Sequence, residues 1–233
     1  MKELLKTLFN KYNISYSEDM IEKLDLFYNI VVEENKKFNL TAITEKYDFA
    51  VKHILDCAMV FSVINKDAKI IDVGAGAGFP SIVLKIIRPD LNFTMLDSLN
   101  KRVKFLNETV DKLQLANIKA YHDRAEDFAN KHREEYDIAI ARAVAPLNTL
   151  SEYCLPLVKV NGNFIAMKGS AFNDEIKIAQ NAINLLGGKI ASIQTISIAE
   201  MEGERANIVI EKNNKTPQKY PRGKNLPRLK PLC

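Results

Sequence analysis

The order of apolar and polar residues divides the chain into a helical first part and a longer part in which strands and helices alternate. Most of the first 65 residues have apolar side chains at helical spacing, and Ser17 stands where a helix N-cap is expected. Residues 38–44 mix polar and apolar side chains without a helical period, which predicts a loop. The predicted helices of this part are Met1–Tyr12, Ser17–Lys37 and Glu45–Ile64.

From residue 66 onward, β-branched runs alternate with helical patterns, which is typical of a doubly wound α/β sheet. Helices are expected from Pro80 to about Ile87 and from about Leu99 to Leu115, the second one capped by Ser98. A short turn around residues 202–204 separates the last two runs, so they predict an antiparallel hairpin. The predicted strands are Ile70–Val73, Asn92–Asp97, Asn117–Tyr121, Tyr136–Ala141, Asn163–Met167, Lys189–Ile198 and Ala206–Glu211.

Three alternating glycines follow the first predicted strand and precede a helix. Glycine there lets the backbone turn sharply and approach a ligand at the carboxyl edge of a parallel sheet. The spacing is not the dinucleotide fingerprint Gly-x-Gly-x-x-Gly, because the third glycine would then fall at Phe79 or Ser81. An acid at the strand end supplies an acceptor suited to a nucleoside, which favours S-adenosylmethionine over NAD. The candidate cofactor residues of this turn are Asp72, Gly74, Gly76 and Gly78.

Two further acids follow the next two predicted strands. Asp97 ends the second strand, 23 residues beyond Gly74, near the interval at which such folds place a carboxylate on ribose hydroxyls. Glu126 lies in the loop after the third strand, where an adenine ring would be held. The sequence therefore predicts a Rossmann-like, class I S-adenosylmethionine-dependent methyltransferase, with a seven-stranded, mostly parallel sheet, a terminal antiparallel hairpin and an N-terminal helical extension.

Composition and length narrow the class further. We expect three regions in the 233 residues, namely a helical extension (1–65), a cofactor-binding domain (66–212) and a basic C-terminal arm (213–233). The three cysteines form no Cys-x-x-Cys pair, which argues against disulfides and a structural metal site and fits a reducing cytoplasm. The longest apolar segment is too short to span a bilayer, and the N-terminus lacks a secretory signal.

All of the basic excess lies at the C-terminal end. Seven Lys or Arg and no acid occur between Lys212 and Lys230, and without them the formal charge of +4 becomes −3. Four of the eight prolines also lie in this end, and they disfavour a regular helix. The pattern predicts an extended arm that contacts RNA phosphates, remote from the cofactor, with a frayed tail or a strap across the sheet as alternatives. The RNA-binding candidates are Lys215, Lys219 and Arg222.

Taken together, the motifs of the chain resemble those of the glucose-inhibited division protein B family, bacterial methyltransferases of N7 of a guanine in 16S ribosomal RNA. The resemblance covers essentially the whole chain. Two departures, Ser81 and Cys57-Ala58, are small or apolar residues on predicted helices and leave it intact. The matching segments are Asn39–Thr44, His53–Asp56, Asp72–Pro80, Leu96–Arg102, Arg124–Glu126, Ala141–Ala145, Lys168-Gly169 and Tyr220–Arg222.

The resemblance implies a cofactor, partners and site residues. The cofactor would be S-adenosylmethionine, and the substrate 16S ribosomal RNA or the small ribosomal subunit. We expect a cytoplasmic monomer without a metal or a membrane. Phe79 would either cover the cofactor or fill the core. By this resemblance, the cofactor contacts are Gly74, Phe79, Ala125, Glu126 and Arg142.

The chemistry of such a site requires little of the protein. N7 of guanine carries a lone pair and no proton, so direct in-line methyl transfer needs no general base. A cation near O6 and N7 is a usual way to hold guanine; Arg142, Lys168 and Arg205 are the candidates, with Asn39 lining the pocket. A methyltransferase of a non-RNA substrate and a non-catalytic S-adenosylmethionine-binding regulatory module remain as alternatives.

Overall fold

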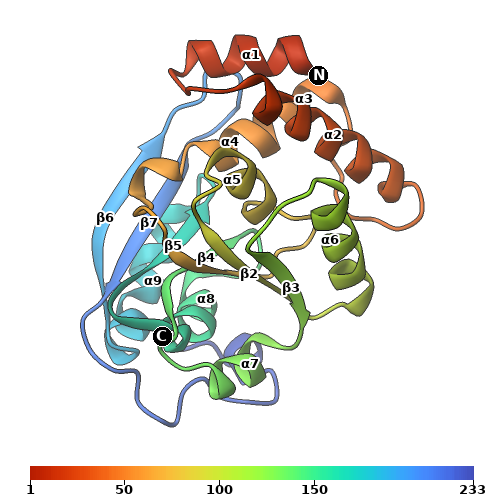
Figure 1. Cartoon of the computed structure of the whole chain (residues 1–233). Coiled ribbons are helices and arrows are strands. Elements are labelled where there is room, and N and C mark those ends of the chain that lie inside the picture. Colours follow the sequence, from red (N-terminus) through yellow and green to blue (C-terminus); the bar gives the residue numbers. More distant parts are fainter.

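A seven-stranded sheet with helices on both faces forms the centre of the protein (Figure 1). The computed structural model describes residues 1–233, except for the side chain of Ser62. The strand order is β3-β2-β1-β4-β5-β7-β6, and β7 is antiparallel to both of its neighbours while the other pairs are parallel. This confirms the predicted mostly parallel sheet with a closing hairpin. The strands are β1 (Lys69–Val73), β2 (Asn92–Asp97), β3 (Ile118–His122), β4 (Tyr136–Arg142), β5 (Val158–Lys168), β6 (Gly188–Ile196) and β7 (Arg205–Lys212).

Two hydrophobic clusters lie on the two faces of the sheet. The N-terminal helices, α5 and α6 belong to the first cluster, and α7, α8 and α9 belong to the second. Among the described residues, no helix combines the length and the apolar composition that crossing a membrane requires. The α-helices are α1 (Lys2–Lys11), α2 (Glu18–Asn35), α3 (Lys46–Phe49), α4 (Asp56–Ala58), α5 (Ser81–Ile87), α6 (Asn100–Lys112), α7 (Ala125–Lys131), α8 (Leu147–Cys154), α9 (Phe172–Leu185) and α10 (Leu226–Leu229).

The central strands are apolar on both sides because both sides are covered. In β4, Ile138 and Ile140 enter the first cluster, whereas Ala139 and Ala141 enter the second. Side chains alternate between faces along a strand, so one short segment contributes to both cores. Full burial of each isoleucine stabilises the fold by about 1.5–3 kcal/mol.

The N-terminal helices share the first cluster with the sheet. Phe27 of α2 and Phe49 of α3 both pack against Phe79, with ring centroids 5.4 and 5.5 Å away. Ser17 caps α2, since its hydroxyl accepts a hydrogen bond from the Met20 backbone N–H at 3.2 Å, as the sequence predicts. The helical extension is therefore packed directly against the glycine turn that follows β1.

The continuous helix expected over Glu45–Ile64 is wrong. The segment breaks into α3, a π-helical turn η1 (Ala50–Leu55), α4 and a 3₁₀ turn η2 (Phe61–Val63). The side chain of Arg142 makes hydrogen bonds to three residues of this segment, and these tertiary contacts override its local helical pattern.

The expected cap of α6 is also wrong, because Leu99 and not Ser98 is its N-cap residue. The carboxylate of Asp97 already accepts the Leu99 backbone N–H at 2.9 Å. The start of α6 is therefore fixed by the same acid that ends β2.

The C-terminal residues 213–233, which we call the C-terminal strap, are docked on the protein rather than extended from it. Figure 1 shows the strap leaving β7, passing α7 and returning to α8. Arg133 donates hydrogen bonds to the carbonyls of Tyr220 and Thr216 at 2.6 and 2.8 Å, and Tyr220 is buried. The strap also contains one helical turn, α10, which was not expected. Pro227 is compatible with that turn because it lies at its start.

We predict that the ion pair between Arg222 and Glu152 stabilises the docked strap. Arg222 donates to Glu152 through its backbone N–H and its guanidinium at 2.7–2.8 Å, and Glu152 is fully buried. Arg222→Ala should lower the free energy of unfolding by about 3 kcal/mol in urea denaturation, because it leaves a buried carboxylate without its cation. Lys230→Ala, at an exposed strap position, is the control; equal losses in both variants would contradict the prediction.

Candidate active site

Three neighbouring cavities lie along the carboxyl ends of the parallel strands. The first, of about 330 Å³, lies over β1, β2 and the start of α7; the second, of about 380 Å³, lies over the glycine turn; the third, of about 340 Å³, lies over the ends of β4 and β5. The first and second share Gly74 and Asp97, and the second and third share Arg142 and Ala143. A ligand in the first two cavities would therefore point its end toward the third.

The glycine turn is folded tightly against β2. The backbone N–H groups of Gly74 and Ala75 both donate to the carbonyl of Leu96, at 2.8 and 3.1 Å. Gly74 has a φ of +82°, and a Cβ built on it would lie 2.5 Å from a methyl carbon of Val144. The missing side chain thus lets Val144 pack directly on the turn, and both residues line the first and the second cavity.

Asp97 connects the glycine turn to α6. One carboxylate oxygen accepts the Gly76 N–H at 3.0 Å, and the other accepts the Leu99 N–H at 2.9 Å. Asp97 is 4% exposed and lines both the first and the second cavity. The sequence analysis expected this carboxylate at the ribose of a ligand; that contact stays a prediction, for a residue that lines two cavities.

Asp72 does not face the crevice as the sequence analysis expected. It is completely buried below the turn, where one carboxylate oxygen accepts the Ser81 N–H at 3.3 Å and the other has no partner among the described atoms. Burial raises the pKa of Asp72 to about 7. Asp72 and Gly78 line none of the three cavities, so the structure gives them a place in the turn and no contact surface for a ligand.

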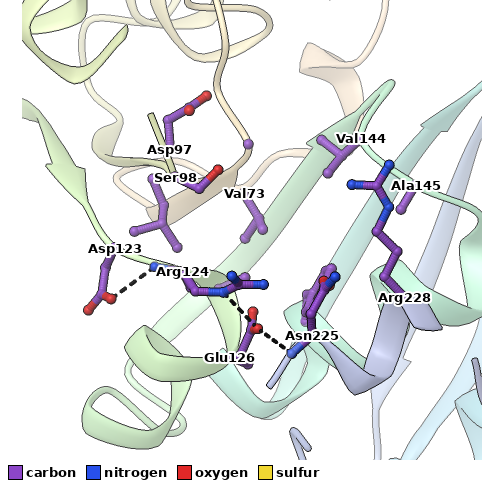
Figure 2. Close-up of a pocket in the computed structure, with 14 residues that line it drawn as sticks. Val73, Asp97, Ser98, Asp123, Arg124, Glu126, Val144, Ala145, Asn225 and Arg228 are labelled. Carbon is purple, nitrogen blue, oxygen red and sulfur yellow. Dashed lines mark hydrogen bonds and ion pairs between the residues drawn. The ribbon is translucent and has the colours of Figure 1, made fainter. Parts of the chain in front are cut away.

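Glu126 closes the far end of the first cavity. Its Oε1 atom accepts hydrogen bonds from Arg124 Nε at 2.9 Å and from the backbone N–H of Asn225 at 3.2 Å (Figure 2). Ala125, beside it, also lines the cavity. The role of Asn225, a residue of the strap, was missed by the sequence analysis because no local pattern links it to the loop after β3.

Arg142 sits between the second and third cavities and is held by the helical extension. Its guanidinium donates to the Lys52 carbonyl at 2.9 Å, to Nδ1 of His53 at 2.8 Å and to the sulfur of Cys57 at 2.9 Å. Asp56 lies 3.4 Å away as the counter-charge. The guanidinium is 5.6 Å from the centroid of the Phe79 ring, so these contacts fix its position over that ring.

His53 and Thr41 are site residues that sequence reasoning quoted only as parts of a motif. Because Nδ1 of His53 accepts from Arg142, its Nε2 carries the proton and donates to the Thr41 hydroxyl at 2.8 Å. Burial, and then the nearby Arg142 charge, lower the pKa of His53 to about 3. His53 is therefore neutral at physiological pH, and both of its ring nitrogens are engaged.

Phe79 combines the two roles considered from sequence. It is 8% exposed, stacks on His53 at 4.2 Å between centroids and packs in the first cluster. It also lines the second cavity. The ring is thus mainly a core side chain, and its small exposed part borders the second cavity.

The three cationic candidates all line the third cavity, but they differ in their partners. Lys168 donates to the Ala145 carbonyl and pairs with Glu175 at 2.6 Å, and Arg142 is held as described. Arg205 lines the cavity, and its guanidinium has no hydrogen bond or ion pair among the described residues. Asn207, two residues further along β7, is 1% exposed and its amide nitrogen has no acceptor in the described structure. The structure does not place Asn39 in this lining, whereas Ile43 of the same loop is part of it.

The three RNA-binding candidates differ in their surroundings. Lys215 and Lys219 are exposed, and the Lys219 ammonium lies 5.2 Å from the centre of the Tyr220 ring. Arg222 is occupied by Glu152, so its charge is largely neutralised within the protein. In the described part of the chain, no cluster of three or more His, Cys, Asp or Glu could hold a metal ion.

Known proteins share both the sequence and the fold. The model of the GidB family, described as rRNA small subunit methyltransferase G, matches residues 20–205. Proteins named "Ribosomal RNA small subunit methyltransferase G" from Oceanobacillus iheyensis and Bacillus thuringiensis are 48% and 47% identical, covering 94% and 99% of this chain and 94% and 98% of their own. A solved structure of M. jannaschii TYW2 in complex with AdoMet matches with a TM-score of 0.55 and 14% identity, over 69% of this chain and 76% of that one; this likeness concerns the fold alone.

We predict that Asp72→Asn raises the free energy of unfolding at neutral pH relative to its value at acid pH, compared with the wild type. The folded-state pKa of about 7 lies above the usual value of 3.8, so the folded protein binds more protons than the unfolded chain between these values. Stability contributed by Asp72 therefore falls as pH rises from about 4 to about 7. In urea denaturation, the free energy of unfolding of Asp72→Asn should increase relative to that of the wild type between about pH 4 and about pH 7. Above pH 7 the difference between the two proteins should be constant. A difference that does not change with pH would contradict this assignment.

Proposed function

We propose that this chain, which belongs to the GidB family of rRNA small subunit methyltransferases, transfers a methyl group from S-adenosylmethionine to N7 of a guanine in 16S ribosomal RNA. The observation that carries the proposal is the row of three cavities, in which Arg142 separates a cofactor-sized space from a cationic pocket. A donor and an acceptor bound on either side would meet at this residue.

The residues of the first two cavities fit S-adenosylmethionine. Asp97 offers carboxylate oxygens to ribose hydroxyls, and Ala125 and Glu126 border the space for the adenine ring. Gly74 lets the turn approach Val144 where a Cβ would clash, and the second cavity extends from the turn toward Phe79 and Arg142. The bound cofactor supplies the electrophilic methyl group, and the protein orients it toward the third cavity.

The third cavity supplies hydrogen-bond donors that suit the O6 and N7 edge of guanine. Arg205 presents a guanidinium that has no hydrogen bond or close ion pair among the described residues, and Asn207 presents a buried amide nitrogen that lacks an acceptor. A buried donor without an acceptor destabilises a protein by about 1–3 kcal/mol, which a bound base can offset. We assign guanine binding to these two residues and to Lys168, with Arg142 at the boundary.

The proposed reaction uses positioning rather than proton transfer. The imidazole of His53 borders the second cavity, but it is neutral and its Nδ1 lone pair already accepts from Arg142. N7 has no proton to lose, so a base would serve no purpose. Catalysis then rests on in-line alignment of sulfur, methyl and N7, and on fixed dipoles around the moving charge.

A division of labour among three regions completes the proposal. Residues 66–212 supply most of the lining of the cofactor cavities, and residues 1–65 hold Arg142 through the π-helical turn and border the second cavity with Thr41 and His53. Residues 213–233 retain exposed lysines, Lys215 and Lys219, that can contact phosphates. The protein acts as a monomer in the cytoplasm in this proposal.

We predict that the methyl acceptor is N7 itself. Small-subunit RNA carrying 7-deazaguanine at the modified position should accept no methyl group from radiolabelled S-adenosylmethionine, whereas unmodified RNA should be methylated. With unmodified RNA, the rate should show no ionisation of an essential base between about pH 6 and 9. Methylation of the deaza substrate would move the reaction to another atom and overturn this assignment.

A second prediction concerns the cofactor. Asp97→Asn should weaken binding of S-adenosylhomocysteine about 10- to 100-fold in calorimetry, because it removes charged acceptor capacity from the ribose position. Lys2→Ala, which removes an exposed ion pair with Glu22 far from the residues that line the cavities, is the matched control. Binding of NAD as tight as that of S-adenosylmethionine would exclude the proposed cofactor.

A further inference from the structure

The C-terminal strap forms part of the wall of the first cavity. Asn225 and Arg228 line that cavity together with residues from β1, β2 and the start of α7. Figure 2 shows Arg228 and Arg124 entering the hollow from opposite sides, with Glu126 and Asn225 at its base. A segment more than 80 residues away in sequence from α7 therefore completes the site at its adenosine end.

The strap is held there by polar side chains of α8 that are buried in the folded protein. Asn148 donates to the Leu232 carbonyl at 2.8 Å, and Thr149 donates to the Pro227 carbonyl at 3.0 Å. Glu152 accepts from Arg222 as described, and these three α8 residues are between 0 and 5% exposed. Buried polar groups are costly without partners, so α8 is built to receive the strap in this position.

Asn225 links the docked strap to the acid at the cavity. It has a left-handed backbone with φ of 59°, which directs its N–H to Oε1 of Glu126. Arg124 donates to the same oxygen, so both hydrogen bonds fix the carboxylate through one atom. The second oxygen, Oε2, receives no hydrogen bond from the described residues and is available to an N–H donor of a ligand.

Arg228 is a cationic side chain of the cavity wall that no described residue pairs with. It is exposed, and its guanidinium has no hydrogen bond or ion pair among the described residues. The neighbouring lining is partly apolar, with Val144, Ala145 and Tyr153. An arginine beside apolar walls suits the face of a π-system, since guanidinium groups stack on aromatic rings.

We propose that the C-terminal strap is a component of the cofactor site, in which Arg228 stacks on the purine ring of the cofactor and Asn225 positions Glu126 for the edge of that ring. This inference rests on the proposed function for the identity of the ligand. It corrects the sequence-based expectation that the C-terminal residues are remote from the cofactor. Arg228 is a binding residue, and Asn225 acts through Glu126 as a positioning residue.

The test measures binding of S-adenosylhomocysteine and of methylthioadenosine, which lacks the amino-acid end, to the full-length protein by calorimetry. Arg228→Ala should weaken both ligands by about tenfold, because a cation stacked on a ring contributes on that order. Lys230→Ala, exposed in the same strap, should leave both affinities within about twofold of the wild type. Loss of RNA affinity alone in Arg228→Ala would make this residue a phosphate contact and overturn the inference.

Asn225 provides an independent test. Asn225→Val should weaken both ligands several-fold, because a β-branched residue is strained at this positive φ, whereas Asn225→Gly should bind as the wild type does. Melting temperatures are measured alongside, and equal ligand affinity in all strap variants would leave the strap a stabilising element and overturn the inference. A wild-type protein that binds S-adenosylhomocysteine while Arg228→Ala binds it equally well overturns the strap inference only. A wild-type protein that binds none of these ligands overturns the proposed function.

Discussion

The position of the Arg142 guanidinium is the constraint on which the site depends. A buried cation is stable in a protein only with several partners, and here the N-terminal segment supplies them through Lys52, His53, Asp56 and Cys57. To do so, the segment forms a π-helical turn in place of a regular helix, as is common near functional sites. The helical extension and the sheet are thus parts of one site, because neither alone fixes this charge at the boundary between the cavities.

The same principle explains the other end of the site. The polar residues of α8 would not suit a helix packed against an apolar sheet, yet they are buried there under the C-terminal strap. Their hydrogen bonds hold the strap in the position from which Asn225 reaches Glu126. The contacts that stabilise the docked strap are therefore the ones that place it at the first cavity. The N-terminal and C-terminal ends of the chain therefore act alike, each completing a cavity that the sheet leaves open.

The sequence predicts well what local patterns determine. The strand Asn92–Asp97 matches β2, Ser17 caps α2, and the glycine turn lies where a parallel sheet ends. The errors arise where a distant residue decides the local structure. Arg142 holds the segment that was expected to form one helix over 45–64, Asp97 accepts the Leu99 N–H just before α6, and Glu152 holds an arginine expected to face RNA. None of these partners lies within the window in which periodicity operates.

Asp72 shows why a motif residue need not be a contact residue. An acid before a glycine turn indicates a ligand acceptor when only the sequence is considered, but here the carboxylate lies beneath the turn and supports the first N–H of α5. Asp72 is buried and one of its oxygens has no partner, so its ionised form is disfavoured. An apolar residue at this position would avoid the resulting loss of stability. This unfavourable burial lies at the turn that borders the second cavity. Asp72 therefore acts on the site only through the backbone that it supports, whereas Asp97 and Glu126 themselves border the cavities.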